Sequence, residues 1–151
     1  GNAKAQFNLG VRFDHGRGVP KDHSAALKWY LSAAEQGHAK AQFNLGMRYE
    51  KGWGVRQDMA EAVRWYRRSA EQGATRAQAM LGLCYADGRG VAKDLVMAHV
   101  WLELASDIQP ERYATELASV SSQISAEQKS EARQMARVKR AELKKFRTEL
   151  E

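Results

Sequence analysis

The chain has 151 residues, of which 44% are hydrophobic and 28% are charged. This composition excludes an intrinsically disordered chain, and no run of about 18 apolar residues is present to span a bilayer as a helix. The formal net charge of +6 is moderate, and about half of it comes from the C-terminal segment. Ala, Leu, Glu, Lys, Arg and Gln are abundant and there are only two prolines, which predicts an all-α protein.

The single cysteine, Cys84, excludes an intramolecular disulfide, so packing alone must hold the fold together. The residues begin at Gly1 without a methionine or a leader segment. We expect any targeting signal to have been removed or to lie outside this chain, and the compartment stays open.

An internal repeat organises the first two-thirds of the chain. Residues 3–10, with the sequence AKAQFNLG, recur without a mismatch at residues 39–46, an offset of thirty-six residues. A third, more diverged copy starts at Thr75. Repeats of this period are typical of solenoids, in which each unit buries its apolar face against its neighbours. The expected divisions are the end of a preceding repeat (1–2), three repeats (3–38, 39–74 and 75–110) and C-terminal capping helices (111–151).

Two helices are predicted within each copy, because small and apolar residues recur at helical spacing, as at Ala5, Leu9 and Phe13. The pattern G-x-G-V-x-x-D separates the two helices in every copy. We expect its first glycine to end helix A in the left-handed conformation and its aspartate to cap the start of helix B. The predicted caps are Gly16, Gly52 and Gly88, and Asp22, Asp58 and Asp94.

A glycine lies inside each helix A, at Gly10, Gly46 and Gly82, where it is unfavourable by about 0.5–1 kcal/mol relative to alanine. Close approach of helix B is the expected compensation. We predict that the tryptophans of helix B are the large side chains that face these glycines, and that all of them are core residues. They are Trp29, Trp65 and Trp101.

The segment after the third copy lacks the repeat pattern but is also predicted to be helical. A short helix is expected from about Glu111 to Val120. Ser125 and Gln128 then form a capping box that predicts the start of a long helix. Terminal repeats need a cap with a polar outer face, and we expect these helices to supply it.

The run A-x-A-Q-x-x-L-G, followed by G-x-G-V-x-x-D and then A-x-x-W, resembles the Sel-1-like repeat, a relative of the tetratricopeptide repeat. The resemblance covers residues 1–110, and Gly1 aligns with Gly37. It implies an α/α right-handed superhelix, or solenoid, of three helix-turn-helix repeats closed by C-terminal capping helices. It also implies a protein-protein interaction scaffold without catalytic activity, often in bacterial signalling, envelope or host-interaction pathways. The periplasm, the envelope and the cytoplasm all stay open as its location.

The resemblance to tetratricopeptide repeats places one face of each helix A on the concave surface of the array. The positions lie three to four residues apart, as one helical face requires. They are Lys4, Phe7, Val11 and Asp14; Lys40, Phe43, Met47 and Glu50; and Arg76, Ala79, Leu83 and Ala86. The resulting groove is apolar along its floor and basic along one rim, and we hypothesise that it binds an extended or helical peptide with acidic flanks. In the alternative interpretation, the apolar members pack between adjacent helices or are covered by the C-terminal helices.

The last predicted helix raises other partners, nucleic acid or an anionic membrane, because its basic residues are closely spaced. They are Arg133, Arg137, Lys139, Arg140, Lys144, Lys145 and Arg147. Glutamates interrupt the run and no base-reading motif accompanies it, so a solvated helix face is favoured. An imperfect apolar stripe would alternatively allow pairing with a second copy. The stripe consists of Met135, Val138, Leu143, Phe146 and Leu150.

No catalytic, cofactor-binding or metal-binding residue is predicted. The histidines at 15, 23, 38 and 99 show no H-E-x-x-H spacing, and Cys84 is interpreted as a packing thiol within helix A. The G-x-G of each loop has no preceding strand and no following G-K-[ST], which excludes a phosphate-binding loop.

Overall fold

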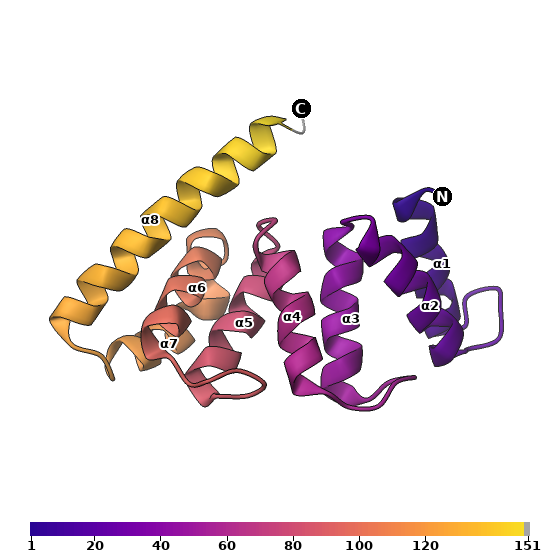
Figure 1. Cartoon of the computed structure of the whole chain (residues 1–151), viewed down its shortest axis with the longest axis horizontal. Coiled ribbons are helices and arrows are strands. Elements are labelled where there is room, and N and C mark those ends of the chain that lie inside the picture. The colour runs from indigo at the N-terminus through magenta and orange to yellow at the C-terminus, as the bar shows by residue number, and fades with distance from the viewer. Residues whose placement is uncertain (150–151) are drawn as a thin grey trace. The chain divides into compact units, whose positions relative to one another are not determined.

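The computed structural model describes residues 1–149, which form eight α-helices and no strand (Figure 1). The helices are α1 (Ala3–His15), α2 (His23–Glu35), α3 (Ala39–Lys51), α4 (Met59–Ala70), α5 (Thr75–Asp87), α6 (Leu95–Ile108), α7 (Pro110–Ser121) and α8 (Ala126–Glu149). The predicted all-α repeat fold is confirmed. The chain divides into two compact units, the first of residues 1–69 and the second beginning at Ala70, and each unit is described by itself.

The loop between the two helices of each hairpin has the predicted caps. Gly16, Gly52 and Gly88 follow α1, α3 and α5 with φ of 67°, 70° and 67°, in the left-handed region. The carboxylate of Asp22 accepts the N–H groups of Ser24 and Ala25, both at 2.9 Å. Asp58 and Asp94 accept equivalent N–H groups at the start of α4 and α6. The loop pattern therefore acts as two helix caps in all three copies.

Each helical glycine lies against a side chain of the following helix, but that side chain is not the predicted tryptophan. A Cβ atom added to Gly10 would lie 2.7 Å from the Tyr30 ring, and one added to Gly46 would lie 2.5 Å from the Tyr66 ring. In the third hairpin the facing residue is Leu102, with its Cγ 2.8 Å from a Cβ on Gly82. The prediction was wrong because the residue after each tryptophan points about 100° further around the helix, and that direction faces the glycine.

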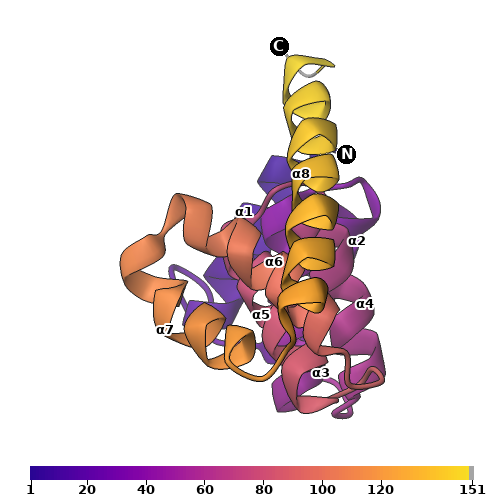
Figure 2. The same cartoon turned by 90° about the vertical axis from the view of Figure 1, so that its left-hand side faces the viewer.

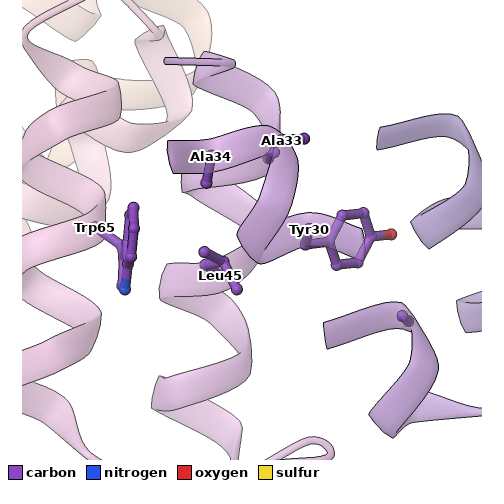
Figure 3. Close-up of a cluster of buried hydrophobic side chains, with 7 residues drawn as sticks. Tyr30, Ala33, Ala34, Leu45 and Trp65 are labelled. Atoms are coloured by element: carbon purple, nitrogen blue, oxygen red, sulfur yellow. The ribbon is translucent and has the colours of Figure 1, made fainter. Parts of the chain in front are cut away.

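The tryptophans pack elsewhere. Trp65 is 8% exposed and belongs to a core cluster of the first unit with Ala33, Ala34 and Leu45. Figure 3 shows Trp65 and Tyr30 on opposite sides of Leu45 and Ala34. Trp101 is also buried in its own unit, whereas Trp29 is only half-buried. The prediction that these side chains are core residues is therefore confirmed for the second and third repeats, but Trp29 is only partly covered.

In the second unit, α7 packs beside α6 in the manner of a further helix A. Tyr113 forms a buried cluster with Ala79 of α5 and Ala105 of α6. Val120 clusters with Leu102, and Leu117 packs against the same cluster. Tyr113, Leu117 and Val120 stand thirty-six residues after Ala77, Leu81 and Cys84. The segment therefore keeps the packing positions of helix A although the repeat pattern is lost.

The last helix begins with the predicted capping box: the Ser125 N–H donates to Gln128 Oε1 at 2.9 Å, and the Gln128 N–H donates to Ser125 Oγ at 3.1 Å. Figure 2 shows α8 in front of α6, against which it packs. Two fully buried alanines, Ala132 and Ala136, allow this close approach. The Arg140 guanidinium then donates to Glu103 and to Asp107, each at 2.6 Å.

Candidate functional site

The predicted groove residues of the first unit lie on α1 and α3, and they differ in exposure. Lys4 and Lys40 are exposed, and Phe7, Val11 and Met47 are half-buried. Phe43, by contrast, is only 7% exposed and lies 5.6 Å from the Tyr66 ring, measured between centroids. The accessible part of the face is therefore two lysines and three apolar side chains.

One hollow lies at the N-terminal ends of α1 and α3. It is lined by Lys4, Phe7, Asn8, His38 and Lys40, together with Ala39. The Phe7 ring forms its floor and stacks on the His38 imidazole at 4.7 Å between centroids. Burial and the nearby Lys40 ammonium lower the pKa of His38, so the imidazole is neutral at pH 7. The rim of this hollow is basic through the two lysines.

A second hollow of about 230 Å³ lies toward the C-terminal ends of the same two helices. Its lining combines predicted and unpredicted residues: Val11, Asp14, His15, Tyr30, Asn44, Met47, Arg48 and Trp53. Val11 and Met47 are the aliphatic members, and Trp53 comes from the loop between α3 and α4. Sequence patterns at helix A spacing did not reveal Trp53, because it lies outside the helix.

Asp14 does not present a free negative charge to this hollow. It forms an ion pair with Arg48, whose side chain is almost completely buried. It also lies within hydrogen-bonding distance of His23 Nδ1, at 2.9 Å. Burial by itself would raise the pKa of Asp14, but Arg48 and His23 outweigh burial and hold the pKa below its usual value. The carboxylate is therefore ionised and balanced by Arg48 within the protein.

Glu50, the equivalent acid of the second repeat, also points inward. Its side chain is 9% exposed, and Oε2 accepts a hydrogen bond of 2.5 Å from the Tyr66 hydroxyl. Glu50 is thus buried, and Asp14, with 17% of its side chain exposed, is paired with Arg48. The charges left toward solvent on this face are those of Lys4 and Lys40.

The third helix A, α5, carries the remaining predicted positions of the face. Arg76 is exposed, but Ala79 is 2% exposed beneath Tyr113 of α7. Leu83 and Ala86 pack against the cluster that contains Val120. The chain's own seventh helix therefore covers Ala79, whereas Leu83 and Ala86 are half-buried, as Val11 and Met47 are in the first unit.

The basic residues of α8 are partly engaged within the second unit. Arg140 binds Glu103 and Asp107, and the Lys139 ammonium lies 4.7 Å from the centroid of the Trp101 ring. Of the predicted apolar stripe, Met135 and Leu143 are half-buried, while Val138 is 55% exposed and Phe146 36% exposed. The Arg147 side chain and Leu150 lie outside the described residues.

Within the described part of the chain, no three His, Cys, Asp or Glu side chains are grouped as a metal site would require. His15 and His23 both lie beside Asp14, whereas His99 is buried on α6, with its Nδ1 3.4 Å from Glu103 Oε2. Cys84 is fully buried, which suits the packing role predicted for it. Among residues 1–149, no helix combines the length and apolar character that crossing a membrane demands.

Comparison with known proteins gives a family match and structural neighbours. The family model of the Sel1 repeat matches three times, at residues 3–38, 39–73 and 75–108. The crystal structure of a Sel1 repeat protein from Oxalobacter formigenes is 43% identical, with a TM-score of 0.75, over 77% of this chain and 48% of that one. A protective antigen present in uropathogenic Escherichia coli strains, which displays an SLR fold, is 44% identical with a TM-score of 0.69.

The second alignment covers 71% of this chain and 23% of the antigen, so the present chain spans less than half of either neighbour. A search of curated proteins returned no match.

Proposed function

This chain belongs to the Sel1 repeat family, whose members are generally scaffolds for protein-protein interaction, and we propose that it binds a partner protein through the face formed by α1 and α3. The partner supplies a peptide segment that combines an apolar residue with acidic flanks. The chain acts in this proposal as a scaffold and not as an enzyme, without cofactor or metal.

The observation that carries the proposal is the pair of hollows along α1 and α3. Each combines apolar lining with polar groups, Phe7 beside Asn8 in one and Val11 and Met47 beside Asn44 in the other. Concave surfaces that mix apolar floor and a few polar groups are suited to holding side chains of a partner. The positions on α5 are left out of the proposed site, because neither of the two hollows includes them.

The charge that we expect of the partner follows from which charged side chains of this face are exposed and which are paired within the protein. Asp14 is balanced by Arg48, and Glu50 accepts from Tyr66, whereas Lys4 and Lys40 are exposed. The face therefore attracts acidic segments and repels basic ones. The basic residues on α8 give weaker support to a nucleic-acid partner than this face gives to an acidic peptide. One of them, Arg140, is already bound to Glu103 and Asp107.

The test is selection of a phage-displayed library of random peptides on the full chain. We expect enrichment of sequences in which an apolar residue lies between aspartates or glutamates. Reversing both rim charges, Lys4→Glu with Lys40→Glu, should raise the Kd of a selected peptide about tenfold or more. Because both side chains are exposed, the far-UV circular dichroism should not change.

The matched control reverses two exposed lysines outside the face, Lys28→Glu with Lys93→Glu. Failure to enrich any peptide, or equal loss of affinity in the two double variants, contradicts the proposed face.

A further inference from the structure

Trp53 departs from the repeat pattern at an exposed position. The equivalent residues of the other two loops are Arg17 and Arg89, and the second loop alone has a tryptophan there. Trp53 is large and hydrophobic, and yet 43% of it is exposed. Single exposed hydrophobic side chains are common on protein surfaces, but Trp53 also lines two hollows, one with Val11 and Met47 and one with Lys21.

The loop that carries Trp53 is held in place from two sides. Arg48 Nη1 donates to the Trp53 carbonyl oxygen at 3.0 Å and to the His23 carbonyl oxygen at 3.3 Å. The next residue, Gly54, has a φ of 72°, and a Cβ atom there would lie 2.6 Å from the same His23 oxygen. The loop therefore lies directly on the start of α2, where a side chain at position 54 would not fit.

This attachment fixes where the indole lies. Its ring is nearly parallel to the His23 imidazole, at 15° and 6.5 Å between centroids. It lines the hollow that contains Val11 and Met47, and it also lines an adjoining hollow that contains Lys21. Trp53 thus stands between an apolar recess and an exposed ammonium group.

We propose that Trp53 is the anchor of the partner-binding face: an aliphatic or aromatic side chain of the partner packs against Trp53, Val11 and Met47, and an acidic residue beside it is held by Lys21. The inference rests on the proposed function and names the residues that set its specificity. Asp14 is the acidic residue among the described residues that line these two hollows. It does not repel the acidic residue of the partner, because Arg48 balances the charge of Asp14.

The energetic reason is the rigidity of the loop. A contact residue that is ordered before binding loses little conformational entropy when the partner arrives. Tryptophan is also enriched among the residues that dominate binding energies, because it buries a large apolar area with few rotatable bonds. The same ring on an unattached loop would contribute less.

The experiment replaces Trp53 by the residue that the other two loops have. Trp53→Arg keeps the backbone carbonyl that Arg48 binds, so circular dichroism and thermal unfolding should match the unmodified chain. We expect the Kd of the library-selected peptides to rise about tenfold or more, and Trp53→Phe to restore most of the affinity. The matched control Arg89→Trp introduces the indole into the third loop and should leave the Kd unchanged.

The acidic contact is tested by a double-mutant cycle between Lys21→Glu and a selected peptide whose acidic residue is replaced by its amide. Coupling between the two changes supports the contact, and additive effects overturn it. Unchanged affinity of Trp53→Arg, together with weakened binding by Lys4→Glu and Lys40→Glu, overturns the anchor and leaves the proposed function standing. Absence of any enriched peptide overturns both.

Discussion

The second and third helix hairpins share a backbone pattern but differ in the chemistry of their interiors. Both close on a helical glycine, Gly46 or Gly82, against which a side chain of the next helix packs. Around that contact the second hairpin has Arg48, Glu50 and Tyr66, where the third has Cys84, Ala86 and Leu102. The second hairpin thus has a hydrogen-bonded interior, with Tyr66 donating to Glu50, and the third an apolar one.

The two hairpins also differ in what lies beside their side chains. The apolar residues of the third hairpin are in contact with α7 through Leu117 and Val120, so this hairpin has its neighbour within the chain. The second hairpin keeps exposed polar groups and a hollow beside Met47. Two hairpins of one chain can therefore share a backbone pattern and differ together in a set of interior residues.

The largest effect that would break this comparison is expected at Arg48. Arg48→Met removes the cation that balances Asp14. It also removes the donor to the carbonyl oxygens of His23 and Trp53. Because Arg48 is 1% exposed, its loss should cost about 3–5 kcal/mol: the partly buried Asp14 loses its counter-ion, and the carbonyl groups of His23 and Trp53 lose their donor. The free energy of unfolding should fall by that amount in urea denaturation followed by circular dichroism.

Pairing the change with Asp14→Ala should recover part of this loss, because the second variant no longer has the unbalanced carboxylate. A double variant as unstable as the sum of the two single ones would show that Arg48 stabilises the fold independently of Asp14, through its packing and its hydrogen bonds to the carbonyl oxygens of His23 and Trp53.

A somewhat smaller effect is expected where α7 covers the third repeat. Tyr113→Ala empties the space above Ala79 and Ala105, and loss of a large buried aromatic ring costs about 3 kcal/mol. The second unit should lose stability, and amide hydrogen exchange should increase in α7. Tyr113→Phe is the control, since it keeps the ring and should change little. Equal protection of α7 in Tyr113→Ala would show that the ring does not hold the helix.

The smallest effect is a pH dependence of stability, to which His99 contributes in the second unit and His38, whose pKa burial also lowers, in the first. Burial of His99, aided by Lys129 and Arg133 and opposed by Glu103, lowers its pKa in the folded second unit. An unfolded histidine has a pKa of about 6.5, so the unfolded chain binds a proton below that pH before the folded unit does. Stability is therefore complete above about pH 6.5 and falls as the pH decreases below it.

The measurement is urea denaturation at several pH values between about 7.5 and 5, in the unmodified chain and in His99→Gln. The variant should lose less stability over this range. The pKa of Asp14 is also lowered, but the ordinary pKa of a carboxyl group lies below that of histidine. The stability that Asp14 contributes should therefore be lost only at more acidic pH. An identical pH profile in the two proteins would exclude His99 as the responsible group.

Local signals in the sequence predicted most of the fold. The left-handed glycines, the aspartate caps and the Ser125 capping box are each set by a few neighbouring residues, and all were predicted correctly. The identity of the side chain on each helical glycine was not, because Trp65 and Tyr66 are adjacent and spacing alone does not say which one faces the partner helix. The helix α7 was predicted at about residues 111–120, but its packing as a further helix A was not, because Tyr113 stands at the position of a small residue in the repeats.

The candidate site was predictable only in part. Helical spacing placed Lys4, Phe7, Val11 and Met47 correctly along the hollows. It could not show that Asp14 is used internally, because its partner Arg48 lies in the next repeat and no local rule pairs them. The signal that was available is comparative: one copy departs from the other two at Trp53, where they have Arg17 and Arg89, and at Cys84, where they have Arg12 and Arg48.

The contacts of Arg48 also determine which segment can be transplanted between repeat arrays. A block cut at the family boundary, residues 39–73, would carry the guanidinium but leave behind the carboxylate of Asp14 and the carbonyl of His23. A chimaera built from that block would contain a buried cation without its counter-ion unless the host chain supplied both groups. The smallest exchangeable cassette is therefore a pair of successive repeats, and protein engineers who recombine such arrays one repeat at a time should expect failures at this junction.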